Sequence, residues 1–85
     1  MKEILLDCSG INSPRELHHA LAEQLSLPIW YGHNLDALHD CLTALPEDIS
    51  LILTHFDTMG KWAIGFRRVM EDSCSENPHL TVTIQ

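Results

Sequence analysis

Four side chains between residues 36 and 43 have the types and the spacing that could do chemistry. They stand at i, i+3, i+4 and i+7 of a helical repeat: Asp36, His39, Asp40 and Thr43. The carboxylates of Asp36 and Asp40 would lie one turn apart in the first two turns of the helix. The helix dipole favours negative charge there, so we expect both to stay ionised at neutral pH. We call this pair the acidic ridge, and its charge favours a basic partner.

The same helix has a face that must be buried. Asn34 is a good N-cap, and apolar residues follow it on one stripe, which we expect to face the core: Leu35, Leu38, Leu42 and Leu45, with Cys41 beside them. Acids on the exposed side of such a helix are usually only solvated surface. Trp30 and Tyr31 come directly before Gly32 and the cap, in a loop that would present two exposed rings beside the ridge. Aromatic rings rimmed by charge favour a binding surface.

Composition narrows the class of partner. The 85 residues predict one small domain, residues 1–85, and the formal charge of -7 disfavours nucleic acid and anionic membranes. We expect a basic protein as the partner.

The start of the chain shows no secretory leader, and no apolar run is long enough to span a bilayer, which predicts a cytoplasmic location. The odd, widely spaced cysteines predict reduced thiols and neither a disulfide frame nor a zinc site, and we expect no cofactor: Cys8, Cys41 and Cys74.

The remaining chain alternates strands and helices, which predicts an α/β fold with a small three-stranded parallel sheet packed by helices. Ser13 and Pro14 start a first helix that Pro28 ends. The expected strands span residues 3–7, 49–54 and 80–84, and a further helix spans residues 62–74.

The segment from Tyr31 to Thr43 resembles the signature segment of the barstar family, intracellular inhibitors of the ribonuclease barnase. The resemblance covers the whole chain, and further matching groups lie outside the signature segment: Leu17-His18 and Leu21, Leu25 to Pro28, Phe66-Arg67 with Cys74, and Leu80 to Ile84. It implies a monomeric inhibitor whose helix and preceding loop occlude the active site of a basic, barnase-like ribonuclease.

By this resemblance Asp40 takes the central acidic position and mimics a substrate phosphate, while Asp36 pairs with neighbouring basic groups. Trp30 takes the place of an aromatic residue that packs on an active-site histidine. The whole implied surface comprises Trp30, Tyr31, Asn34, Leu35, Asp36, His39, Asp40, Thr43 and Ala44.

Several positions depart from the family pattern. His39 replaces a tryptophan, His33 replaces an acid, Ala44-Leu45 replace a Gly-Trp pair, and Arg68 stands where the third helix normally offers a glutamate. The last change reverses a charge. Either Arg68 points elsewhere, Glu71 or Asp72 takes the place of the glutamate, or the cognate ribonuclease differs from barnase at the facing position, and we favour the last explanation.

Two other functions remain open. The cluster of imidazoles and carboxylates could hold zinc or nickel: His33, Asp36, His39 and Asp40. Against this, His33 and His39 are six apart, and a helix favours ligands at i and i+4. The ridge could also bind a basic protein that is not a nuclease. No nucleophile has a histidine and an acid at motif spacing, so we expect no enzyme.

Overall fold

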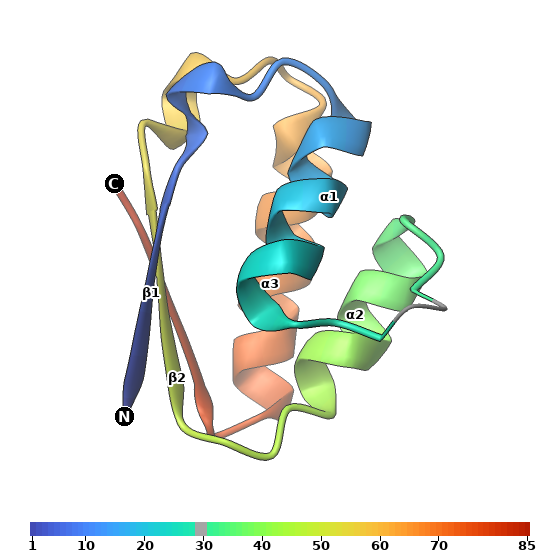
Figure 1. Cartoon of the computed structure of the whole chain (residues 1–85), viewed down its shortest axis with the longest axis vertical. Coiled ribbons are helices and arrows are strands. Elements are labelled where there is room, and N and C mark those ends of the chain that lie inside the picture. Colours follow the sequence, from blue (N-terminus) through green and yellow to red (C-terminus); the bar gives the residue numbers. More distant parts are fainter. Residues whose placement is uncertain (29–30) are drawn as a thin grey trace.

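A three-stranded parallel sheet forms one side of the protein, and helices cover one of its faces (Figure 1). The computed structural model describes residues 1–28 and 31–85. In chain order its elements are β1 (Lys2–Asp7), η1 (Cys8–Gly10), α1 (Pro14–Leu25), α2 (Leu35–Thr43), β2 (Ile49–Thr54), η2 (Phe56–Thr58), α3 (Ala63–Glu76) and β3 (Leu80–Ile84). The predicted α/β class is confirmed, and the short 3-10 turns η1 and η2 were not foreseen.

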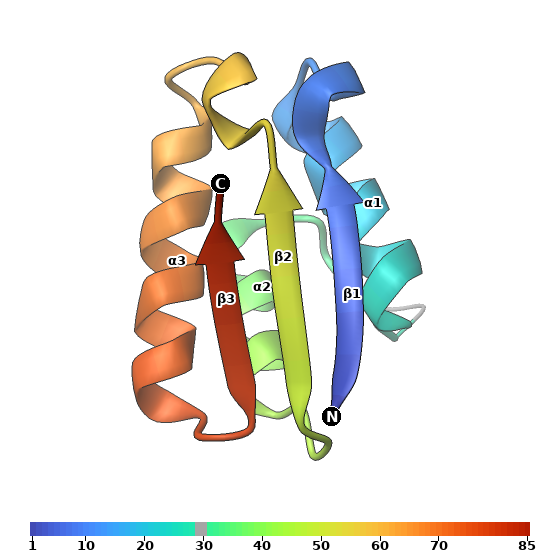
Figure 2. The same cartoon turned by 90° about the vertical axis from the view of Figure 1, so that its left-hand side faces the viewer.

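The sheet has the order β1-β2-β3, and both neighbours of β2 run parallel to it. Alternate residues of β2 are buried, namely Ile49, Leu51 and Leu53. In Figure 2 both connections pass behind the sheet and lead from β1 on the right to β3 on the left, which is the usual right-handed sense. All three helices therefore lie on the same face.

The helices form two layers behind the sheet. α1 packs against β1 and α3 against β3, while α2 packs against α3 and lies farthest from the strands (Figure 1). The stripes predicted from leucine spacing are buried: Leu17, Leu21 and Leu25 of α1, and Leu38, Cys41 and Leu42 of α2. Leu35 and Leu45, at the two ends of the α2 stripe, are only partly buried. The outer position of α2 leaves its polar side open to a partner.

The opposite face of the sheet has no helix on it and faces the viewer in Figure 2. Glu3, Leu5 and Asp7 of β1 are exposed there, and the side chain of Leu5 is 65% exposed. The face is thus a polar surface with a few apolar side chains, and it lies away from α2.

Side-chain caps fix where α1 begins. The Ser13 Oγ accepts a hydrogen bond from the Glu16 N–H at 3.2 Å, and Pro14 occupies the first turn. Ser26 ends the helix in the left-handed conformation, with φ of 52°. α3 differs from its prediction of residues 62–74. It starts one residue later and ends two residues later, because Trp62 offers no capping hydrogen bond and no breaker stands at Cys74.

Candidate partner-binding site

The start of α2 is fixed by the cap that the sequence predicts. The Asn34 Oδ1 accepts a hydrogen bond from the Ala37 N–H at 2.8 Å, and the Asn34 carbonyl accepts one from the Leu38 N–H at 2.9 Å. Leu35 packs against α3 at Gly65, where an added Cβ would stand 3.0 Å from its Cδ1. The predicted contact residues Asn34 and Leu35 thus also position the helix, and a side chain at Gly65 would push α2 outward.

Both carboxylates of the acidic ridge are exposed on the outer side of α2. In the part of the chain that the structure describes, neither Asp36 nor Asp40 has an ion-pair partner within 4.0 Å. Both can therefore accept hydrogen bonds from a cationic partner without first losing an internal one.

His39, the third polar residue of this face, already has a partner. It is half-buried, and its Nε2 forms an ion pair with the carboxylate of Glu76 near the end of α3. Three charged residues of α3 are spaced at i, i+4 and i+8 and therefore lie along one edge of the helix: Arg68, Asp72 and Glu76. The contact of Glu76 with His39 shows that this edge borders α2. Arg68 is exposed, and helical spacing places it about two turns before Glu76 along this side of α3.

The end of α2 is held by hydrogen bonds that sequence reasoning did not foresee. The Thr43 Oγ donates to the carbonyls of His39, at 2.8 Å, and Asp40, at 3.2 Å, so its hydroxyl is occupied inside the helix. The buried Asn77 donates from its Nδ2 to the carbonyls of Leu42, at 2.9 Å, and Leu45, at 3.1 Å. The Asn77-Pro78 dipeptide is typical of a turn, but this pattern does not predict the contact of Asn77 with α2. Ala44, between these carbonyls, is exposed.

The expected exposure of Tyr31 is wrong. Its ring is only 6% exposed, and its hydroxyl is hydrogen-bonded to Nδ1 of the buried His18 in α1. Burial raises the pKa of Tyr31 to about 12, and burial together with the nearby His33 lowers the pKa of His18. Both groups are neutral at pH 7, so the pair acts as a neutral hydrogen bond that anchors the loop to α1.

The exposed His33 follows Tyr31 in the left-handed conformation, with φ of 49°. Its ring is nearly parallel to that of His18, with 6.1 Å between the centroids. Tyr31 and His33 of the loop before α2 thus both pack against His18 of α1. Trp30, the other predicted aromatic contact, lies outside the described residues.

Comparisons with known proteins identify the family of the chain. Residues 1–78 match the family model described as "Barstar (barnase inhibitor)". The chain belongs to the barstar family. A Bacillus subtilis (strain 168) protein named "Putative ribonuclease inhibitor YrdF" is 32% identical to it in an alignment of 81 residues, and the alignment covers 89% of each chain. The family is described as an inhibitor of barnase, which indicates a ribonuclease as the partner of the chain.

Other kinds of site find little support in the described residues. Across residues 1–28 and 31–85, no group of three or more histidines, cysteines and acids is close enough to hold a metal ion. The proposed ligands His33, Asp36, His39 and Asp40 do not form one. The helices seen in the same residues are all too short or too polar to cross a bilayer.

Proposed function

We propose that this protein inhibits a barnase-type ribonuclease by placing α2 and the preceding loop in the basic active site of the enzyme. Asp40 would take the position of an RNA phosphate, and Asp36 would pair with basic groups beside it. One observation carries the proposal: the two exposed carboxylates of the outermost helix have no ion-pair partner among the described residues.

The physical basis is charge and geometry. A ribonuclease binds a polyanion, so its cleft presents arginine, lysine and histidine, and carboxylates pair with guanidinium groups through two parallel hydrogen bonds. The net charge of -7 would speed encounter with such a cleft. The caps at Asn34 and Asn77 hold α2 in place before binding, which lowers the entropy lost on association.

Arg68 bears on which ribonuclease is bound. It is exposed, and it lies along the edge of α3 that borders α2. An arginine facing a basic cleft would be repelled, so we propose that the cognate enzyme is neutral or acidic where it meets Arg68. We further propose that inhibition takes place in the cytoplasm, where the RNA to be protected lies, and that the protein acts there as an antitoxin.

The test is RNA cleavage by a small secreted barnase-like ribonuclease, titrated with the wild-type protein and with the double variant Asp36→Ala, Asp40→Ala, at low and high salt. Truncating one partner of a buried charge pair typically costs about 2–5 kcal/mol, a range known from such interfaces, barnase with barstar among them. The double variant should therefore lose inhibition by more than about 30-fold. Glu3→Ala, Asp57→Ala is the matched control, since it removes the same charge from exposed sites outside α2.

Three outcomes would count against the proposal. Equal loss in both double variants would mean that overall charge matters and the ridge does not. Arg68→Ala weakening inhibition as much as Asp40→Ala would refute the roles given to these residues. Binding that leaves RNA cleavage intact would instead indicate an acidic interaction module that does not occlude an active site.

A further inference from the structure

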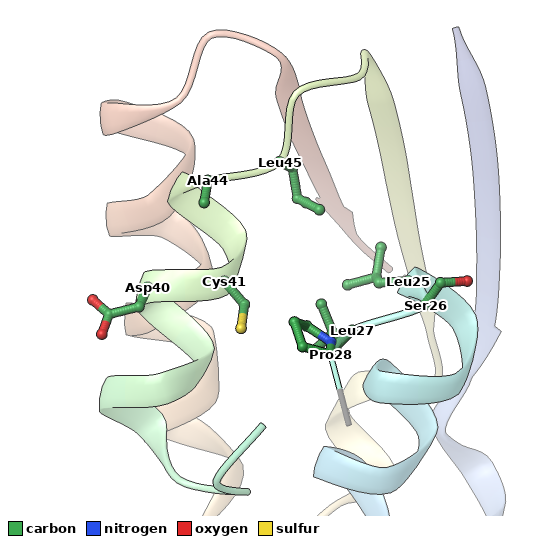
Figure 3. Close-up of a pocket in the computed structure, with 8 residues that line it drawn as sticks. All are labelled: Leu25, Ser26, Leu27, Pro28, Asp40, Cys41, Ala44 and Leu45. Carbon is green, nitrogen blue, oxygen red and sulfur yellow. The ribbon is translucent and has the colours of Figure 1, made fainter. Parts of the chain in front are cut away.

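A pocket of about 260 Å³ lies between the end of α1 and the second half of α2, beside the acidic ridge (Figure 3). Its lining comes from the last turn of α1 and the residues after it, and from α2 and its C-terminal end: Leu25, Ser26, Leu27, Pro28, Asp40, Cys41, Ala44 and Leu45. In Figure 3 the thiol of Cys41 points into the gap between the two segments, whereas the carboxylate of Asp40 lies on the outer side of α2. Asp40 thus belongs both to the pocket lining and to the ridge, and its carboxylate points away from the pocket.

The walls are mostly apolar. Leu25, Leu27, Pro28 and Leu45 contribute hydrocarbon, and Cys41 is only 8% exposed. Burial raises the pKa of the Cys41 thiol, so it stays protonated and serves as a small apolar wall, not as a nucleophile. Pockets for whole small-molecule ligands measure about 300–1,000 Å³. The smaller volume here suits a single large side chain.

The charge beside the pocket determines whether the neighbouring residue of a bound partner can be a cation or an anion. Asp40 is the charged residue of the lining, and no lysine or arginine lines the pocket. Ala44 caps the C-terminal end of α2, where the helix dipole is negative. The carboxylate on the outer side of α2 and the dipole at the end of the helix both favour a cation beside the pocket and disfavour an anion. Aromatic anchors in a pocket with a charged rim are a common form of binding hot spot.

We propose that this pocket is a specificity-determining subsite that receives one aromatic side chain of the ribonuclease, next to the basic residue that pairs with Asp40. The proposal rests on the proposed function and adds to it a chemical requirement on the partner. The Asp40 carboxylate lies on the outer side of α2, so the basic residue would reach it across the surface of this one helix, whose diameter with side chains is about 10–12 Å.

Three capped dipeptides test the subsite without any ribonuclease: acetyl-Arg-Phe-amide, acetyl-Arg-Ala-amide and acetyl-Glu-Phe-amide. Each is titrated into the isotopically labelled protein, and amide chemical shifts are followed by NMR. We expect Arg-Phe to shift the amides of Leu27, Cys41 and Leu45 saturably, with a dissociation constant at least threefold lower than that of either other peptide. Equal binding of all three peptides, or none at these amides, would overturn the proposal.

Protein variants locate the binding. Leu45→Trp fills the pocket from its wall and should abolish the Arg-Phe shifts, while Leu5→Trp, on the open face of the sheet, should leave them unchanged. Ala44→Trp, at an exposed lining position, should act like Leu45→Trp and guards against misfolding of the first variant. Binding that survives both blocking variants would refute the location. Binding seen only in Trp30→Ala would mean that the indole of the protein itself competes for the pocket, and would also overturn the proposal.

The cleavage assay with wild-type protein distinguishes failure of the proposed function from failure of the proposed subsite. If the ribonuclease is inhibited and the ridge variant loses inhibition, but Arg-Phe does not bind, the subsite is refuted and the inhibitor stands. If Arg-Phe binds as expected and the protein binds the ribonuclease without slowing cleavage, the subsite is supported and its assignment to occlusion of an active site is refuted.

Discussion

Asn77 offers a sharp test of how the end of α2 is held. It is 3% exposed, and three hydrogen bonds end on its side chain. Its Nδ2 donates to the carbonyls of Leu42, at 2.9 Å, and Leu45, at 3.1 Å, and its Oδ1 accepts from the His79 N–H at 3.0 Å. A hydrogen bond contributes about 0.5–1.5 kcal/mol net, and a buried group left unsatisfied costs more. Asn77→Ala should therefore lower the free energy of unfolding by roughly 2–4 kcal/mol.

Asn77→Asp makes the test specific for the donated hydrogen bonds. It keeps the shape of the side chain and the acceptor for His79, but it places a carboxylate oxygen against the two carbonyls of α2. It should be at least as destabilising as Asn77→Ala at neutral pH. Ser75→Ala is the control, because Ser75 is exposed and its hydroxyl donates only a 3.4 Å bond to the Glu71 carbonyl. That change should stay within about 0.5 kcal/mol.

The assay is urea unfolding followed by circular dichroism, with thermal unfolding as a check. In a domain of this size 1 kcal/mol shifts Tm by about 4–8 °C, so Asn77→Ala should lower Tm by at least about 8 °C. A loss below about 0.5 kcal/mol for Asn77→Ala, or an Asn77→Asp variant as stable as the wild type, would refute the reasoning.

Two further predictions concern the contacts that position the site. Burial lowers the pKa of His18 below its ordinary value of 6.5, so the unfolded chain takes up a proton at this position before the folded protein does. The contribution of neutral His18 to stability is therefore complete above about pH 6.5 and is lost as the pH falls below that value. His18→Leu should flatten the dependence of Tm on pH over this range. A dependence of Tm on pH that is the same in His18→Leu as in the wild type would contradict the assignment. Gly65→Leu introduces a good helix former at a position where an added Cβ would stand 3.0 Å from the Leu35 Cδ1. It should cost about 1–3 kcal/mol by overpacking, measured by urea unfolding, with Ile64→Leu at an exposed neighbour as control; a stabilised Gly65→Leu would show that α2 does not pack there.

Local signals in the sequence were enough to predict the three strands, the three longer helices and the exposed side of α2. The caps at Ser13 and Asn34 act within three residues of themselves, and the apolar run of β2 needs no knowledge of distant residues. The exposure of Asp36 and Asp40 followed from helical spacing alone. These features depend on neighbours in the chain, which a single sequence displays.

The misjudged features depend on contacts between distant segments. Tyr31 looked like an exposed ring because its partner His18 is 13 residues away and belongs to another element. The ion pair of His39 with Glu76 and the hydrogen bonds of Asn77 likewise join α2 to residues more than thirty positions later. No local pattern specifies such pairs, because the fold must first bring them together.

The placement of α2 as the layer farthest from the strands also affects how proteins of this kind can diverge. Substitutions at Asp36 or Asp40 alter solvent-facing atoms and leave Leu38 and Leu42, which hold the helix on α3, untouched. Under the proposed function, the residues of the acidic ridge can therefore be exchanged one at a time at little cost to folding. The buried core and the proposed binding surface are then free to change at different rates, fast at α2 and slowly at β2.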